Sequence, residues 1–492
     1  MNLKLNDAWF LLIGVVLAGL AAVAIGNPDA NIALYGVAGV MGFVLLLAII
    51  LKPSFGANIL IFAIFTNFSR QLADIGLPGV VIPLVLTVSV AILIRNYYAG
   101  QLPADRKKTF AIEAFLILYF LAMVVSYLAA TNKEQAIFKI MEMVKNIIIV
   151  YTIFFSLRDI FAWKQAIRVV VITTTLLCLL GTYQLVTGNY AQDFFGFARV
   201  STQGVFDNDS GGTSRLAGPV NDPNMWAQII VAVIPLVLFQ IVNEPDFKLK
   251  VLGAGALGIL SLVLLNTYSR GSYVALTVVI ILVLFVYGKK YNPVLIFLGL
   301  GLFVVMLPFL PAKFADRFDS LKIITPGGTE FNEDGSVQGR LSVMLSGIAM
   351  FADHPLLGVG VGNFQTNYQD YSGKIGIEFE YGERDPHSLV TQILAETGIF
   401  GMITFMGIII SLLSGLAKAL RSISDLPAYK SNVPWLMSLQ VSIIGYLVAA
   451  LFLHDAYIRY FWIIAALSIT AVQLMDEHVN SYESSTMPEF SH

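Results

Sequence analysis

Long apolar segments recur along almost the whole chain, and they constrain its fold more than any other feature. An α-helix needs roughly 17–25 mostly apolar residues to cross the hydrocarbon core of a bilayer. About fourteen segments approach that length, although the third and fourth are short or interrupted by proline. They are residues 8–26, 31–51, 55–67, 79–94, 110–130, 136–156, 165–187, 224–242, 248–266, 271–287, 292–310, 398–418, 433–453 and 458–475.

The overall composition agrees with a fold that is solvated mostly by lipid. Hydrophobic residues make up 57% of the 492 residues and charged residues only 13%, and the mean hydropathy is +0.77. A water-soluble protein could not bury so much apolar surface. We therefore predict an all-α, polytopic transmembrane helical bundle of about 12–14 spans. Residues 1–475 form one membrane domain in this prediction, and residues 476–492 form a disordered cytoplasmic tail.

The first apolar segment and the cysteine content limit two further possibilities. The run 8–26 is long enough to span a bilayer and is followed by more spans, so we interpret it as a membrane anchor rather than a cleaved signal peptide. Cys178 is the only cysteine. A single cysteine excludes an intrachain disulfide and a cysteine-based metal site.

Basic residues in the loops between spans predict the orientation of the chain. Cytoplasmic loops carry an excess of lysine and arginine, and alternate loops of this chain differ strongly in these residues. The poor set holds only Arg70, Lys133 and Arg270. With the rich set inside, both termini are cytoplasmic, and the two longest loops, 188–223 and 311–397, face outward. The rich set comprises Lys52, Arg95, Arg106, Lys107, Lys108, Arg158, Lys164, Lys248, Lys250, Lys289, Lys290, Lys418, Arg421 and Lys430.

The loop 311–397 is too long to be a simple connection, so we expect it to contain short helices. Residues 322–338 are rich in glycine and acidic residues and predict an excursion whose role the sequence does not define. The segment 339–352 is predicted to form an amphipathic helix on the membrane surface. The GVGVGN stretch at 358–363 lacks the setting of a phosphate loop and is interpreted as a flexible turn. The helix is predicted from the spacing of Arg340, Met344, Ile348 and Phe351.

Four residues at the predicted outer face are candidates for chemistry: Arg215, Arg270, Arg340 and His387. Arg270 is the lone basic residue of a very short outer connection, where a positive charge opposes the usual bias. For any single arginine, contact with lipid phosphate is the better explanation. Three arginines and a histidine from separate segments instead favour an anion-binding pocket with a base, because the guanidinium group binds phosphate oxygens in pairs.

His387 follows Asp385 and Pro386 and begins an apolar run with helical spacing, so we expect a helix to start there at the membrane surface. A lone histidine is more often structural than catalytic. Its place at a helix entrance beside an acidic residue nevertheless fits a general base.

Two weaker groups of charged residues complete the candidates. Lys139, Glu142 and Lys145 share one face of the predicted span 136–156. They predict either a polar cavity or a self-paired ladder of charges, and the sequence favours neither. His454, Asp455, Tyr457 and Arg459 form a second outer cluster, which an aromatic belt with a lipid-contacting arginine explains adequately.

Four of these motifs, taken in order, resemble the O-antigen ligase and O-antigen polymerase superfamily of bacterial envelope glycosyltransferases. The motifs are RLAGPVNDPN at 215–224, SRG at 269–271, GR at 339–340 followed by HPLLGVGVGNF, and a His-Ser stretch that runs from His387 to a Gly-x-x-Gly ending at 401. Each motif is short, but together they span residues 213–403 at one predicted face of the membrane.

The resemblance implies a transferase without metal or cofactor that moves a glycan from an undecaprenyl-pyrophosphate carrier to a hydroxyl acceptor. The reaction would occur at the periplasmic face of the bacterial inner membrane. His387 matches the family histidine, Arg215 and Arg270 match the arginines that hold the pyrophosphate, and Arg340 matches the arginine that opens the loop helix. The chain departs from the family in its number of spans, in residues 322–338 and in Asp222. Secondary candidates are Asn224, Asp385, Lys139, Lys145 and Arg459.

Several functions remain open at the level of the sequence. Ligation to lipid A core, polymerisation of repeat units and transfer to a protein hydroxyl would all use the same donor, so the acceptor can be a lipid, a glycan or a protein. A membrane transporter or a lipid-glycan flippase is the alternative from another class. Such a protein should show internal repeats and broken helices around a midplane site, and neither is found in the sequence. Membrane lipids are expected partners, and nucleic acid is not.

Overall fold

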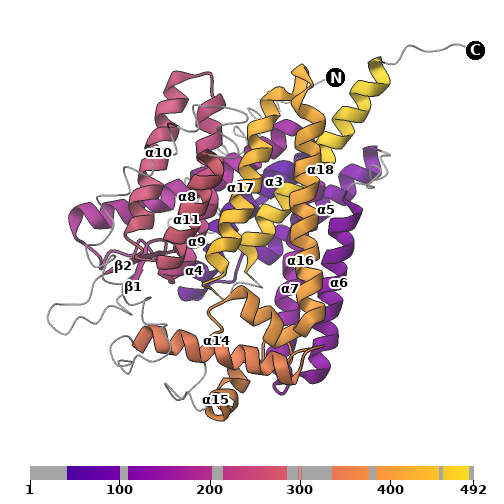
Figure 1. Ribbon diagram of the computed structural model, residues 1–492. Coiled ribbons are helices and arrows are strands. Elements are labelled where there is room, and N and C mark those ends of the chain that lie inside the picture. The colour runs from indigo at the N-terminus through magenta and orange to yellow at the C-terminus, as the bar shows by residue number, and fades with distance from the viewer. Residues whose placement is uncertain are drawn as a thin grey trace, which may run out of the picture.

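The computed structural model describes residues 42–99, 109–201, 214–284, 335–375, 384–453 and 458–486, together with Phe297 and Gly301. These residues are almost entirely helical. Most of the helices stand side by side, while one long helix, α14, lies across their ends (Figure 1). The helices are α3 Pro53–Phe65, α4 Phe68–Asp74, α5 Val81–Ala99, α6 Phe110–Ser126, α7 Lys133–Ser156, α8 Ile160–Thr187, α9 Pro223–Asn243, α10 Phe247–Leu265, α11 Arg270–Ile281, α14 Gly335–Asp353, α15 Phe364–Lys374, α16 Leu389–Ser424, α17 Val433–Ala450 and α18 Arg459–Thr486.

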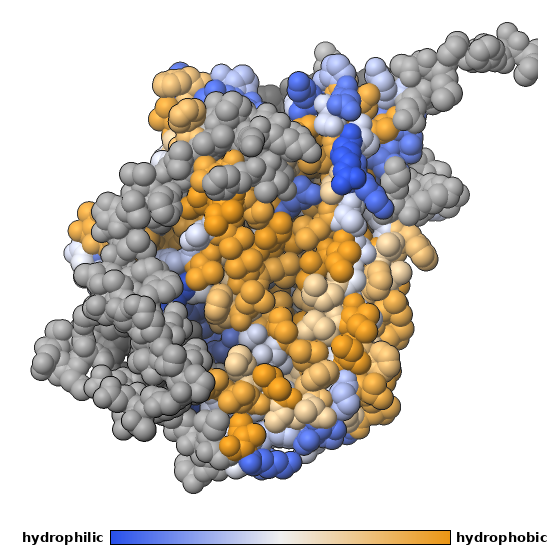
Figure 2. Space-filling model, viewed as in Figure 1, coloured by the Kyte–Doolittle hydropathy of each residue, from blue (hydrophilic) through white to orange (hydrophobic). Residues whose placement is uncertain are grey.

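Seven helices within the described residues are long and apolar enough to cross a membrane. The visible face of the molecule carries a broad apolar band with polar residues at both ends (Figure 2). The prediction of an all-α, multi-pass membrane protein is therefore confirmed. The expected spans 8–26 and 292–310 lie outside the described residues, apart from Phe297 and Gly301. The seven helices cover Val81–Tyr98, Phe110–Ala129, Ile160–Thr187, Pro223–Asn243, Phe247–Leu265, Leu389–Ser424 and Pro427–Ala450.

Two of these helices, α9 and α17, form the centre of the bundle, and most residues of both are buried. Apolar packing alone gives little preference for one helix contact over another in lipid, so small residues and hydrogen bonds between helices gain importance. The Ser442 hydroxyl on α17 donates to the Ala232 carbonyl on α9 at 2.6 Å. The Gln228 amide on α9 donates to the Tyr446 carbonyl on α17 at 3.1 Å. These bonds fix the two helices against each other.

The predicted surface helix 339–352 is observed as α14, which packs on α15 and on the start of α16. Val343 and Met350 are buried on its inner side in a small apolar cluster with residues of α15. Met344 and Ile348 are exposed on the other side. An exposed apolar stripe on a helix that lies across the bundle is typical of contact with a membrane surface. Residues 322–334 of the predicted excursion lie outside the described residues.

The GVGVGN stretch is a closely packed joint rather than the expected flexible turn. The Val359 amide donates to the Ala395 carbonyl of α16 at 2.8 Å, and the Ile399 amide donates back to the Pro355 carbonyl at 2.9 Å. α16 is kinked between these two bonds at Gly398, whose φ of +64° is left-handed. The segment therefore ties α14 to the beginning of α16.

The loop 188–223 contains a two-stranded antiparallel sheet formed by β1 Arg199–Ser201 and β2 Arg215–Gly218. Asp222, which departs from the family pattern, caps the start of α9. Its carboxylate accepts from the amides of Asn224 and Met225 at 2.7 and 3.0 Å. A side-chain oxygen in this place satisfies amides that have no partner within the helix. Asp222 therefore has a structural explanation.

The expectation of a disordered tail at 476–492 is wrong for its first part, because α18 continues to Thr486. Aromatic contacts hold this extension. The Tyr429 ring packs edge-on against His478 at 5.7 Å and against Tyr482 at 6.4 Å. The polar composition of the segment hid this docking, which involves residues almost fifty positions away in the chain. Residues 487–492 lie outside the described residues.

We predict that Gly360→Ala destabilises the joint between α14 and α16. Gly360 has a φ of +106°, and a Cβ atom there would collide with the backbone of Ala130. Backbone atoms cannot move aside as a side chain can, so we expect the free energy of unfolding to fall by about 2 kcal/mol or more. Thermal unfolding in detergent would measure it as a clear fall in Tm. Gly258→Ala on α10, where a Cβ meets no atom within 4 Å, should leave Tm unchanged, and equal effects of the two substitutions would contradict the prediction.

Candidate functional site

Arg215 links three segments that are far apart in the sequence. It is the first residue of β2, its Nε donates to the Thr267 carbonyl at 2.9 Å, and an Nη atom donates to Asn224 Oδ1 at 2.9 Å. The neighbouring Leu216 amide donates to the Asn266 carbonyl at 3.1 Å. The structure therefore brings Arg215 and Asn224 against the turn that leads into α11.

Arg270 is the first residue of α11 and follows this turn directly. The turn is fixed by the Tyr273 hydroxyl, which donates to the Leu265 carbonyl at 2.6 Å. The next residue is glycine because the end of the α17 segment lies close, and a Cβ at Gly271 would stand 2.7 Å from the Cβ of Phe452. A cation at the start of a helix adds to the positive end of the helix dipole. A bound anion would offset both the charge of the Arg270 guanidinium group and the positive end of the helix dipole. The position therefore favours a negatively charged ligand.

His387 lies at the entrance to α16, as its position before an apolar helical run indicates. The next residue, Ser388, is the N-cap of the helix. His387 itself has a φ of +45°, a left-handed conformation that is uncommon outside glycine and costs on the order of 1–3 kcal/mol. Two residues earlier, Asp385 accepts from the Gln365 amide of α15 at 2.6 Å. Contacts from α15 therefore hold the loop that carries the histidine.

Arg340 lies on α14, which packs on α15 and α16, so the same group of helices carries Arg340 and His387. His454, Asp455 and Tyr457 of the second outer cluster lie outside the described residues. Arg459, the remaining member of that cluster, is the first residue of α18. The predicted chemical roles of all these residues stay predictions.

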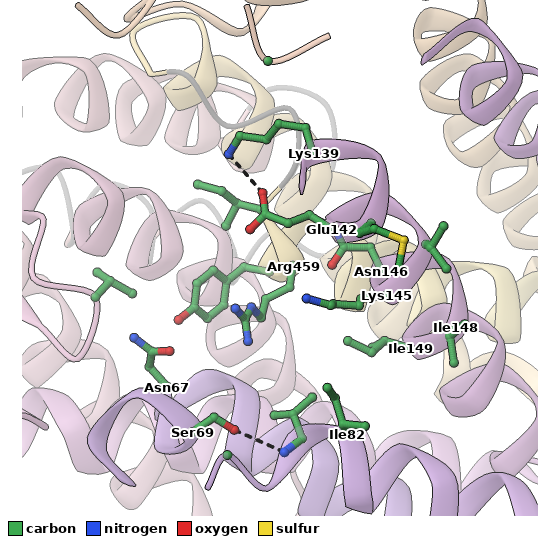
Figure 3. Close-up of a pocket in the computed structure, with 18 of the residues that line it drawn as sticks. Asn67, Ser69, Ile82, Lys139, Glu142, Lys145, Asn146, Ile148, Ile149 and Arg459 are labelled. Atoms are coloured by element: carbon green, nitrogen blue, oxygen red, sulfur yellow. Dashed lines mark hydrogen bonds and ion pairs between the residues drawn. The ribbon is translucent and has the colours of Figure 1, made fainter. Parts of the chain in front are cut away.

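A cavity of about 820 Å³ lies between α5, α7 and the beginnings of α16 and α18 (Figure 3). Its lining includes sequence neighbours of Asn224 and His387 rather than these candidate residues themselves. Val220 and Met225 line it on the side of Arg215 and Asn224, and Asp385 and Pro386 line it directly before His387. The polar lining residues are Asn67, Ser69, Gln135, Lys139, Glu142, Lys145, Asn146, Gln365, Asp385, Gln392, Glu396 and Arg459.

The charged face of α7 combines the two structures that the sequence allowed. Lys139 Nζ lies 3.0 Å from Glu142 Oε2, which is the self-paired arrangement. Lys139, Glu142 and Lys145 also all line the cavity. Lys145 and Arg459 extend into it (Figure 3). Within the described part of the chain, no carboxylate lies within ion-pairing distance of either of these two cations.

Sequence reasoning missed two parts of the cavity wall. Glu396 is 3% exposed and lies in the helix that follows His387. A lone carboxylate in an apolar helix is a signal that could have found it. Asn67 and Ser69 come from α4 and the turn before it, and nothing in their local sequence indicates a site.

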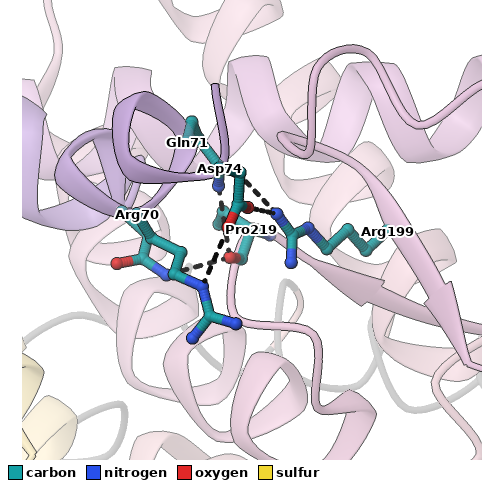
Figure 4. A network of polar contacts seen from close by, with 6 residues as sticks. Arg70, Gln71, Asp74, Arg199 and Pro219 are labelled. Atoms are coloured by element: carbon teal, nitrogen blue, oxygen red, sulfur yellow. Dashed lines mark hydrogen bonds and ion pairs between the residues drawn. The ribbon is translucent and has the colours of Figure 1, made fainter. Parts of the chain in front are cut away.

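α4 is attached to the β-sheet by a network of polar contacts (Figure 4). Asp74 accepts from Arg199 of β1 and pairs with Arg70 at 3.4 Å. Asn67 and Gln71 both donate to the Pro219 carbonyl, at 3.1 and 3.4 Å. The hydrogen bond from Arg199 lowers the pKa of Asp74 below its usual range. Asp74 therefore stays charged at neutral pH, and the network loses this contact only when the pH falls through that lowered pKa.

Part of the chain matches a known protein family. Residues 255–406 match the family model described as O-antigen ligase. No curated protein matches the chain. The matched segment runs from α10 into α16 and includes Arg270, Arg340 and His387. Arg215 and the cavity residues of α4, α5 and α7 precede it.

We predict that the Asp74–Arg199 pair positions the sheet that carries Arg215. Asp74→Arg and Arg199→Asp should each lower Tm and speed hydrogen exchange of residues 214–218, because each places two like charges in contact. The double swap should recover part of both losses. Arg70→Gln removes the longer contact to Asp74 and should have the smallest effect. If the changes in Tm and hydrogen exchange of the double swap equalled the sum of those of the two single variants, the pair would have no positioning role.

Proposed function

We propose that this chain, whose residues 255–406 match the O-antigen ligase family model, transfers a glycan from an undecaprenyl-pyrophosphate carrier to a hydroxyl acceptor. The transfer would take place at the periplasmic face of the bacterial inner membrane. The observation that supports this most is a cavity lined by Asp385 and Pro386, directly before His387, and by Met225, directly after Asn224, which accepts a hydrogen bond from Arg215. A base and a group of cations on either side of one cavity are what such a transfer needs.

The proposed reaction is a direct displacement at the anomeric carbon with inversion. The acceptor oxygen forms a bond to that carbon while the bond from carbon to the diphosphate oxygen breaks. His387 takes the hydroxyl proton, and the lipid diphosphate leaves with the bonding electrons. A positioned base contributes typically 10²–10⁴-fold to such a step. Cations that are already aligned with the leaving group lower the barrier further, because they need no reorganisation during the reaction.

Arg215 and Arg270 are proposed to hold the leaving diphosphate. Arg215 is fixed by bonds to Asn224 and to the Thr267 carbonyl, so little side-chain freedom remains to be lost on binding. Arg270 stands at a helix start, where an anion offsets the unfavourable charge. Arg340 on α14 is proposed as a third contact, because its helix packs on the same elements that hold His387.

The proposed orientation is supported by the distribution of basic residues and by the fold. α14 and α15 lie at one end of the bundle in Figure 1, where α16 begins just after His387. The last turns of α16, with Lys418 and Arg421, lie at the other end. The lysine-rich and arginine-rich loops predict that this second end is cytoplasmic. The first end would then face the periplasm, where lipid-linked glycans are used.

We predict that His387→Ala lowers glycan transfer by about 10²–10⁴-fold and leaves binding of the donor lipid intact. The reason is that the base acts on the acceptor hydroxyl and not on the diphosphate. Transfer would be measured with purified protein in liposomes and a lipid-linked glycan. His354→Ala is the matched control, because this histidine is exposed and lies outside the cavity lining. Full activity of His387→Ala would rule out the base assignment.

We predict that Arg270→Gln weakens use of the donor by about 10–100-fold in kcat/KM, because one charge-assisted contact to the diphosphate is lost. Arg270→Lys should keep part of the activity, since the charge remains without the paired geometry. Arg421→Gln removes the same charge at the far end of α16 and serves as the control. Donor kinetics that do not change in Arg270→Gln would exclude a diphosphate clamp at this position.

A further inference from the structure

The wall of the cavity changes in polarity along α7. Its lining residues on this helix run from Gln135 to Ile149, which is roughly 21 Å at 1.5 Å per residue. Gln135 and Lys139 come first, the charged or polar residues Glu142, Lys145 and Asn146 lie in the middle, and apolar Ile148 and Ile149 follow. A ligand that lies along this wall would match it with a polar head, an anionic centre and an apolar chain, in that order.

The apolar end of the cavity is open at the surface between α5 and α7. Ile82 and Leu86 on α5 are 59% and 61% exposed, and Ile148 on α7 is 44% exposed, although all three line the cavity. Val85 and Ile149 are buried behind them. Because α5 is apolar and long enough to span a membrane, this opening faces lipid. A lipid chain can therefore enter from the side without leaving the bilayer.

The middle of the cavity holds two cations that come from different helices. Lys145 extends from α7 and Arg459 from the start of α18 (Figure 3). Glu142, the nearest acidic neighbour along α7, is engaged by Lys139 at 3.0 Å. Two like charges beside an apolar wall are costly in a membrane unless an anion lies with them. Arginine and lysine are also the side chains that bind phosphate most strongly.

We propose that Lys145 and Arg459 bind the phosphate of a lipid that lies along α7. Its chain leaves between α5 and α7 past Ile82 and Leu86, and its polar head points toward Gln135 and Asp385. This inference rests on the proposed function, because the lipid is taken to be the carrier of the glycan donor. The pair then holds the phosphate next to the chain, while Arg215 and Arg270 hold the phosphate next to the sugar.

The test is binding of undecaprenyl monophosphate, which has the chain and only the phosphate assigned to this pair. Full-length protein in phosphatidylcholine nanodiscs would be titrated and the bound lipid counted by native mass spectrometry. We expect the double variant K145Q/R459Q to bind at least 10-fold more weakly. K418Q/R421Q removes the same charge at the far end of α16 and should bind normally. Undecaprenol, which lacks the phosphate, should not distinguish the two double variants.

Two further variants separate loss of the site from loss of the fold. Lys145→Arg keeps the charge and should retain most of the binding. Leu86→Trp narrows the opening and should weaken binding although both cations remain. Unfolding temperatures of all variants would be recorded, and binding compared between variants whose Tm matches the wild type.

Three results would overturn the inference. The first is binding to K145Q/R459Q within twofold of the wild type, and the second is an equal loss in K418Q/R421Q. The third is equal competition by phosphatidylglycerol, which would make this a general site for anionic lipids. The assay measures lipid binding and needs no glycan transfer, so the two proposals can fail separately. If the wild type transfers glycan but K145Q/R459Q binds the lipid normally, this inference alone is overturned. If the variants show the expected binding pattern but the wild type transfers no glycan, the proposed function alone is overturned.

Discussion

The contact between α9 and α17 is the constraint on which the arrangement of the arginines depends. Hydrogen bonds from Ser442 and Gln228 to carbonyls of the opposite helix lock the pair where apolar packing alone would be weakly selective. α9 begins beside Asn224, which accepts from Arg215. The segment after α17 places Phe452 against Gly271, directly behind Arg270. One pair of buried helices therefore sets the distance between two cations that come from separate loops.

A second rigid unit carries the histidine. The exchange of bonds between the 355–359 segment and α16 ties the surface helix α14 to the kink at Gly398. The kink lies about three turns after His387, at 3.6 residues per turn. The loop that carries His387 is held in addition by the bond from Gln365 to Asp385. The cavity lies between α5, α7 and the beginnings of α16 and α18. The central pair meets its lining through Met225 of α9.

The sequence predicted the features that depend on local pattern. The length of the apolar segments predicted the helices, and the helical spacing of Met344 and Ile348 predicted the surface helix α14. The apolar run after His387 predicted the start of α16. Features that depend on packing between distant segments were missed. The extension of α18 rests on Tyr429, and the cavity wall at Asn67 depends on a bond to Pro219. GVGVGN was interpreted as flexible because glycine alone does not show that backbone lies against it. The motifs gave candidate residues, but only the fold placed Lys145 and Arg459 in one cavity.

The sideways opening between α5 and α7 has a consequence for how the site meets its ligand. An opening lined by exposed Ile82, Leu86 and Ile148 admits molecules that diffuse in the plane of the bilayer. Encounter is then governed by surface density, that is, by the mole fraction of the ligand among the surrounding lipids. Diluting a suspension of vesicles would leave that density unchanged, whereas adding inert lipid would reduce it. Saturation of such a protein is therefore a property of membrane composition rather than of bulk concentration.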